Sequence, residues 1–207
     1  MKPNLIITIS RQLGAGGAFI GQQIAKRLDL RYADREIIRK AAKQLSVREE
    51  DIEKRDEKTQ PFWETLVHSA GFAHEFYVPI NIQYAPTDAE MYAAETDIIG
   101  KIAEKGDAVI IGRCGFHILA PRPNTLRVFL FADAKIRAER VMELYKINRK
   151  DAELAVEDSD RERAKYITAF SGKDWNDATN FDLSLDTGKL GIDNSIEGIL
   201  SFVKFMK

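Results

Sequence analysis

The chain has 207 residues, a formal net charge of -1 and a single cysteine. This length fits one domain with a sizeable core. A near-neutral charge argues against sequence-independent nucleic-acid binding, which needs a basic surface. One cysteine cannot form an internal disulfide, which is typical of a reducing compartment, and no apolar run approaches the roughly 18 residues of a membrane span. We therefore expect a cytoplasmic protein with no nucleic-acid partner and no membrane partner.

Apolar periodicity along the chain predicts strands that alternate with helices. Strands are expected at residues 4–10, 31–33, 108–111, 125–132 and 181–186. Helices are expected at residues 16–28, 34–45, 87–105, 133–145, 148–170 and 192–205. Strands joined by crossover helices form parallel sheets with helices on both faces. The sequence thus predicts a single α/β domain over residues 1–207, a three-layer α/β/α fold with a central parallel sheet of about five strands.

Two segments stand out from this alternation. Residues 46–95 form a predicted helical insertion on the acceptor side, and residues 61–84 within it are unusually aromatic. These rings either pack an inserted helical pair, or some of them line an acceptor site or a contact between copies of the chain in a homo-oligomer. Residues 148–175 are rich in charge, which is typical of a helical lid but equally of a solvated helix face.

The first strand leads into a glycine-rich turn that opens a helix. Glycines allow backbone N–H groups to converge on phosphate oxygens, and a helix start adds a partial positive charge. The expected phosphate cradle consists of Ser10, Gly14, Ala15, Gly16, Gly17 and Ala18. A standard phosphate-binding loop has lysine where this chain has Gly17. Arg11, at the entrance of the loop, is the candidate that supplies the missing charge.

Further candidates follow from the rule that ligands bind at the carboxyl ends of parallel strands. Gly112 and Arg113 end the strand at 108–111, where a guanidinium can fork onto a phosphate or carboxylate. The alternative is a structural ion pair between Arg113 and a nearby helix. Arg161 and Arg163 could deliver positive charge from a closing lid. The three histidines show no metal-ligand spacing, so we predict no protein-built metal centre.

These segments together resemble the P-loop nucleoside monophosphate kinases, and most closely the cytidylate kinase-like family. The blocks that carry the resemblance are residues 7–17, 31–38, 109–113, 127–140, 160–163 and 181–190. Cytidylate kinases have Gly-Lys-Gly-Thr where this chain has Gly16-Gly17-Ala18-Phe19, and an aspartate where it has Cys114. From its own context, Cys114 is predicted to be a small packing residue.

The resemblance implies a phosphotransferase that moves a phosphoryl group from ATP, or another nucleoside triphosphate, to a nucleoside monophosphate or other small acceptor, with Mg²⁺. The predicted catalytic residues are Arg11, Arg113, Arg161 and Arg163. The predicted acceptor-binding residues are Asp34, Arg35, Gly112 and Arg113. Asp34 and Asp133 are the acidic candidates beside the magnesium ion. Because the loop lacks lysine, a non-catalytic nucleotide- or phosphate-binding sensor or regulatory module is the alternative. A scaffold that uses the aromatic insertion is a third hypothesis.

Overall fold

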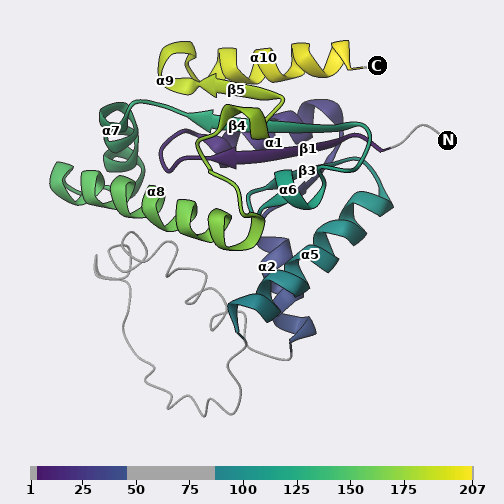
Figure 1. Ribbon diagram of the computed structural model, residues 1–207. Helices are drawn as coiled ribbons and strands as arrows, with labels where there is room; N and C mark the ends of the chain where they lie inside the picture. The colour runs from purple at the N-terminus through teal and green to yellow at the C-terminus, as the bar shows by residue number, and fades with distance from the viewer. Residues whose placement is uncertain (1–3, 46–86, 207) are drawn as a thin grey trace.

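A computed structural model describes residues 4–45 and 87–206 of the chain. The aromatic segment at 61–84, and with it most of the predicted insertion, lies outside the described residues. The strands are β1 (Ile6–Arg11), β2 (Arg31–Ala33), β3 (Ala108–Ile111), β4 (Thr125–Phe131) and β5 (Leu183–Asp186). They form one five-stranded sheet in the order β2-β3-β1-β4-β5, with all four pairings parallel (Figure 1). The predicted fold class is confirmed.

Helices cover both faces of the sheet. The described helices of ten residues or more are α1 (Gly17–Leu28), α2 (Arg35–Gln44), α5 (Asp88–Lys105), α7 (Ala134–Tyr145), α8 (Arg149–Ser171) and α10 (Ile192–Phe205). Three short helices are α6 (Gly115–Ile118), η2 (Ala178–Asn180) and α9 (Thr187–Leu190). Helices α1 and α10 pack on one face, whereas α2, α5 and α6 pack on the other. The sequence analysis did not predict the short helices, because three or four residues are too few to establish a helical period.

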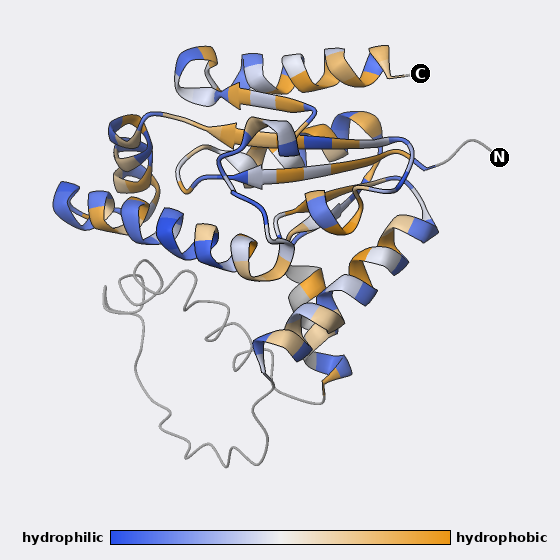
Figure 2. Ribbon diagram, in the orientation of Figure 1, coloured by the Kyte–Doolittle hydropathy of each residue, from blue (hydrophilic) through white to orange (hydrophobic). Residues whose placement is uncertain are grey.

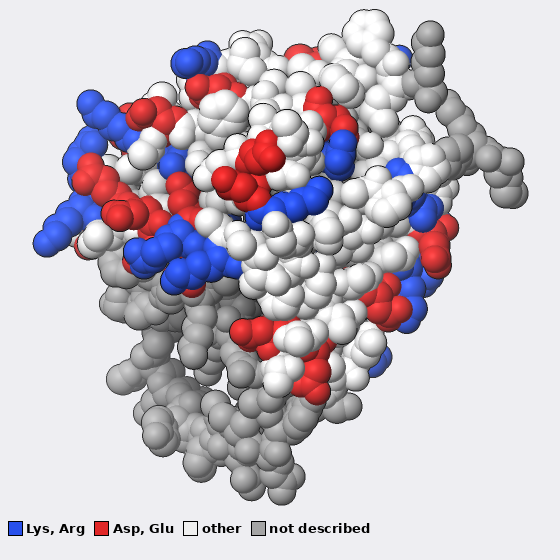
Figure 3. Space-filling view, in the orientation of Figure 1, with Lys and Arg blue, Asp and Glu red and all other residues white. Residues whose placement is uncertain are grey.

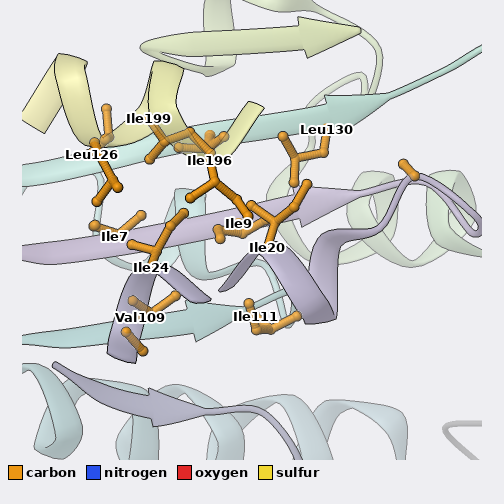
Figure 4. Packing of buried hydrophobic residues seen from close by; sticks show 14 residues of the cluster. Ile7, Ile9, Ile20, Ile24, Val109, Ile111, Leu126, Leu130, Ile196 and Ile199 are labelled. Atoms are coloured by element: carbon orange, nitrogen blue, oxygen red, sulfur yellow. The ribbon is translucent and has the colours of Figure 1, made fainter. Parts of the chain in front are cut away.

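The core on the α1 and α10 side shows how the strands place their side chains. Because successive side chains on a strand point to opposite faces, Ile7 and Ile9 of β1 lie on this side and Ile6 lies on the other. Ile20 of α1 and Ile196 of α10 belong to the same cluster as these strand residues (Figure 4). Both faces of β1 are thus apolar, as expected for a central strand of a parallel sheet.

Helix α5 begins with the capping box that the sequence predicts. The Thr87 hydroxyl accepts from the backbone N–H of Glu90, and the Glu90 carboxylate accepts from the N–H of Thr87. Met91 and Ala94 are buried on the same stripe as Ile98, so the helix packs on the body of the domain from its first turns. Residues 88–95, which the sequence analysis placed in the insertion, therefore form the start of a core helix.

Helix α8 is amphipathic rather than uniformly solvated. Its outer surface is strongly hydrophilic (Figure 2). On the inner side, Ala152 and Val156 pack against Val141 of α7, and the far end of the helix brings Ile167 into an aromatic cluster around Trp175. This anchoring fixes which arginines of α8 face the rest of the molecule. None of the described helices is both long and apolar enough to cross a membrane.

Candidate functional site

The glycine loop connects β1 to α1 through two left-handed residues. Gly14 has φ 78° and Gly16, the N-cap of α1, has φ 80°, a region that side chains disfavour. No side chain caps α1, and its first turn contains no acidic residue. The first-turn amides of a helix have no partner within the helix, and the helix dipole favours an anion there. The predicted phosphate cradle thus coincides with an uncapped helix start, and phosphate binding there stays a prediction.

Two arginines of α7 hold the outer side of this loop. Arg137 donates from Nη1 to the carbonyl of Leu13 at 3.3 Å, and Arg140 donates from Nη1 to the carbonyl of Gly14 at 3.2 Å. Arg140 also donates to the hydroxyl and the carbonyl of Thr187. The loop conformation is thus fixed by side chains from a helix more than 120 residues further along the chain.

Arg137 is one of the most buried charges of the described chain. Its side chain makes a bidentate ion pair with Asp160 of α8, with N···O distances of 3.1 and 2.8 Å, and its Nε donates to the carbonyl of Ala132. Burial raises the pKa of Asp160, although the adjacent Arg137 guanidinium acts in the opposite direction. Candidate-site prediction missed Arg137 and Arg140. Their spacing of three residues, which places both on one helix face, is the signal that could have found them.

Arg11 runs across the glycine loop toward the end of β3. A Cβ atom placed on Gly17 would lie 2.6 Å from Arg11 Cγ, and a Cβ on Gly112 would overlap Arg11 Nη1. Burial and the Asp34 carboxylate raise the pKa of Tyr32, and the nearby charge of Arg11 acts in the opposite direction. The guanidinium of Arg11 therefore lies between the start of α1 and the carboxyl ends of β3 and β2.

Of the two predicted lid arginines, the structure brings only Arg163 to the loop. Arg163 Nη1 donates to the carbonyl of Arg11 at 2.7 Å. Burial and the charge of Arg11 lower the pKa of Arg163, so a positive charge is costly at this position and an anion would relieve that cost. Arg161 is exposed and pairs with Asp158 at 2.5 Å. Figure 3 shows acidic and basic side chains mixed over this part of the surface, as expected of a solvated helix face.

Arg113 lies in a strained turn and is engaged by a carboxylate. Gly112, Arg113 and Cys114 are consecutive left-handed residues, with φ angles of 68°, 53° and 52°. Arg113 Nη1 lies 3.3 Å from Oε1 of Glu95 on α5, and the side chain of Glu95 is only 2% exposed. The hydroxyl of Tyr166 on α8 donates to Oε2 of the same carboxylate at 2.9 Å. The structure thus contains the ion pair that the alternative interpretation of Arg113 required, and phosphate binding by Arg113 stays a prediction.

Cys114 follows Arg113 and packs into the aromatic cluster with Phe116 and Trp175. Burial and the Glu95 carboxylate raise the pKa of the Cys114 thiol to about 12. A thiol in this environment stays protonated at neutral pH and is a poor nucleophile. Its surroundings therefore fit the packing role that the sequence predicted.

The remaining predicted site residues lie around the loop and the strand ends. Ser10 is buried near the end of β1, and Ala18 is exposed in the first turn of α1 next to Phe19, which is 52% exposed. Asp34 accepts from the Tyr32 hydroxyl at 3.2 Å. Arg35 is the first residue of α2, and its side chain lies outside the described part of the chain.

The acidic side chains of the described residues do not gather into a metal-binding cluster. Asp133 caps α7 by accepting from the backbone N–H of Lys135 at 2.9 Å. Within residues 4–45 and 87–206, no three histidine, cysteine, aspartate or glutamate side chains come close enough together to hold a metal ion. The described residues thus offer isolated carboxylates, such as Asp34 and Asp133, rather than a preformed metal centre.

Glu95 is the central residue of the acceptor-side cluster, and we expect its neutral variant to be strongly destabilised. Glu95→Gln keeps the shape but removes the negative charge that faces the largely buried Arg113 guanidinium, at a cost of about 3–5 kcal/mol. Urea denaturation measures this loss. Glu104→Gln, on an exposed turn of the same helix, is the matched control and should change stability by less than about 0.5 kcal/mol. Equal effects of the two changes would contradict a central role of Glu95.

The comparison with protein families agrees with this geometry. The model of the cytidylate kinase-like family matches residues 6–189. The chain belongs to the cytidylate kinase-like family. A cytidylate kinase from Pyrococcus horikoshii is 24% identical over 204 residues, which cover 98% of this chain and 88% of that one. A cytidylate kinase from Methanopyrus kandleri is 29% identical over 101 residues, and the match spans 45% of this chain and about half, 52%, of the relative.

Solved structures place this member of the cytidylate kinase-like family in the same fold. An uncharacterized protein from Eubacterium ventriosum has a TM-score of 0.70 at 21% identity, covering 98% of this chain and 99% of that chain. A shikimate kinase from Bacteroides thetaiotaomicron has a TM-score of 0.53 at 14% identity, covering 97% and 99%. At these identities the likeness shows the fold alone. The predicted resemblance and fold are both confirmed, and the fold is one used by small-molecule kinases.

Proposed function

We propose that this protein is a phosphotransferase that moves the terminal phosphoryl group of ATP, or another nucleoside triphosphate, to a nucleoside monophosphate or another small acceptor. The observation that carries the proposal is the position of Arg11. Its guanidinium lies between the left-handed glycine loop and Gly112, and Arg163 donates to its carbonyl. Phosphoryl transfer depends on positive charge placed around the moving group, and the position of these two arginines supports the proposal.

In the proposed site, the loop from Gly14 to Ala18 holds the donor phosphates through backbone amides. Arg11 neutralises the terminal phosphates, and Arg163 adds charge from α8. An acceptor oxygen attacks the terminal phosphorus while the bond to the bridging oxygen of the leaving diphosphate breaks. A phosphate acceptor is already anionic at neutral pH, so its attacking oxygen needs no general base. For a phosphate acceptor the reaction therefore requires positioning and charge rather than proton transfer. A hydroxyl acceptor would in addition have to give up its proton to a base.

The acceptor is proposed to bind at the ends of β2 and β3. Asp34, Arg35, Gly112 and Arg113 are the residues assigned to this side. Arg161 enters the proposal only if α8 turns toward the site, since its side chain lies on the exposed face in this structure. Helix α8 already contacts the loop strand through Arg163, and it is proposed to help exclude water from the transfer.

Magnesium is proposed to accompany the donor nucleotide. Mg²⁺ usually keeps several water ligands and binds one or two carboxylates together with substrate phosphates. Isolated carboxylates such as Asp34 and Asp133 fit that mode of binding. Phe19 stands where cytidylate kinases have threonine and offers no oxygen to the ion. The ion would thus depend on the phosphates and water for most of its ligands.

A coupled assay of ATP consumption tests the proposal, with nucleoside monophosphates and small hydroxylated compounds as acceptors. Steady turnover that requires one class of acceptor is the expected result. If calorimetry shows that a triphosphate binds but no acceptor is phosphorylated, the catalytic proposal fails and the protein is a nucleotide-binding sensor. If no triphosphate binds with or without Mg²⁺, both hypotheses fail.

Arg163 should contribute strongly to turnover. We expect Arg163→Met to lower kcat by about 10²-fold, because it removes charge beside Arg11 while keeping an unbranched apolar side chain. Lys165→Met is the control, since Lys165 is an exposed cation of the same helix that pairs with Glu162. The control should retain activity within about three-fold, as expected for a surface ion pair. Equal losses in both variants would show that Arg163 acts only through the charge of the helix surface.

A further inference from the structure

The backbone conformation of Gly17 does not explain why this position is glycine. It is the first residue of α1, and its φ is not among the left-handed glycine angles of the described chain. Glycine in a helix costs roughly 0.5–1 kcal/mol relative to alanine. Since the conformation at this position accepts any residue, a neighbouring group must be what excludes a side chain.

That neighbouring group is the start of the Arg11 side chain. A Cβ atom on Gly17 would lie 2.7 Å from Arg11 Cβ and 2.6 Å from Arg11 Cγ. Cβ atoms in proteins essentially never approach within 3.0 Å of a heavy atom that is not bonded nearby. The Cγ atom could rotate away, but the Cβ atom is fixed by the backbone of β1. Positions 11 and 17 therefore cannot both carry side chains unless the strand or the helix start moves.

The backbone at Arg11 has little freedom to make such a move. Arg11 is paired in register with Leu130 of β4, and its carbonyl accepts from Arg163. The next residues are held as well, because the backbone N–H of Gln12 donates to the carbonyl of Leu130 and Arg137 donates to that of Leu13. The direction of the Arg11 Cβ atom is thus set by contacts on both sides of the chain.

This geometry leaves room over the loop for a cationic side chain from position 11 or from position 17, but not from both. In a standard phosphate-binding loop, a lysine at the start of the helix reaches the terminal phosphates. We propose that Arg11 delivers that charge from the strand instead, and that Gly17 is glycine because Arg11 occupies the space a side chain there would need. This inference rests on the proposed function for its phosphate ligand. It makes the lysine-free loop an alternative working site rather than a damaged one.

A set of variants at the two positions tests the proposal, with the dissociation constant for ATP measured by calorimetry. Arg11→Gly should weaken ATP binding at least about ten-fold by removing the charge. Gly17→Lys alone should weaken it by a similar factor, because the new Cβ displaces the helix start or the strand. The double variant Arg11→Gly/Gly17→Lys should recover to within about five-fold of the wild type, since the lysine then has both space and charge.

The matched control has the same charges as the glycine double variant but retains the steric conflict at position 11. Arg11→Ala/Gly17→Lys keeps a Cβ atom at position 11, so it should bind ATP no better than Gly17→Lys alone. Recovery in this control equal to that of the glycine double variant would overturn the steric argument. Failure of the glycine double variant to bind more tightly than either single variant would overturn it as well.

Thermal denaturation of the same series separates this inference from the proposed function. Gly17→Ala should lower Tm by several degrees in the wild-type background and by much less in the Arg11→Gly background. An equal effect in both backgrounds overturns the inference whether or not ATP binds. If the wild type does not bind ATP but the Tm coupling is present, the proposed function and the phosphate role of Arg11 are both wrong. The steric exclusion between side chains at positions 11 and 17 would still be established.

Discussion

Arg11→Met is expected to lower kcat/KM for phosphoryl transfer by about 10²–10³-fold, the loss typical of removing one group that stabilises charge in a transition state. Methionine keeps an unbranched side chain over Gly17, so the packing of the loop against the start of α1 is retained. Only the guanidinium that lies beside Gly112 is lost. The coupled assay at saturating acceptor measures the effect, and circular dichroism confirms that the fold is unchanged.

Lys26→Met is the control for this change. Lys26 is an exposed cation of the same helix α1, nine residues beyond Gly17. At 1.5 Å per residue, it lies about 14 Å further along the helix axis. Its removal should alter kcat/KM by less than about two-fold, because exposed charges at this distance are screened by salt. A similar loss in the two variants would mean that Arg11 contributes only to the overall charge, and its assigned place beside the phosphates would be wrong.

Gly14→Ala should destabilise the fold by about 2–5 kcal/mol, from strain at a left-handed residue together with overpacking. Gly14 has φ +78°, and a Cβ atom there would lie 2.6 Å from the carbonyl oxygen of Arg137. Because that oxygen belongs to the backbone of α7, it cannot move aside as a side chain could. Urea denaturation should show the loss as a lower midpoint with an unchanged slope.

The same substitution at Gly100 provides the comparison. Gly100 lies within α5, and a Cβ atom there would meet nothing within 4 Å. Gly100→Ala should raise stability by about 0.5–1 kcal/mol, because alanine favours the helix and restricts the unfolded chain. If Gly14→Ala were as harmless as Gly100→Ala, the loop would not be held against α7 as described.

The strands and long helices could be predicted because each carries its own apolar period. The alternation in β1 and the stripe of Ile20 and Ile24 in α1 are visible without knowledge of any neighbour. The short helices α6 and α9 carry no such period. The start of α5 does carry a local signal, because Thr87 and Glu90 form a capping box.

The candidate site likewise has a part that the sequence predicts and a part that it does not. Arg11, Gly14 and Gly17 are adjacent in sequence, so their association was predictable from the strand, turn and helix pattern. Glu95 and Tyr166 are 71 residues apart and meet only because α5 and α8 approach the same strand end. One local signal for Glu95 does exist. It lies four residues after Met91 and three before Ile98, so a carboxylate interrupts the apolar stripe of a helix.

The exclusion between side chains at positions 11 and 17 also has an evolutionary consequence. Consider an ancestor with lysine at position 17 in the helix and a descendant with arginine at position 11 on the strand. An evolutionary intermediate that carries both side chains is excluded, because their Cβ atoms would collide. The alternative route passes through glycine at both positions and has no cation over the loop. The two kinds of loop are therefore expected to form separate lineages, with the hybrid sequence absent from natural populations.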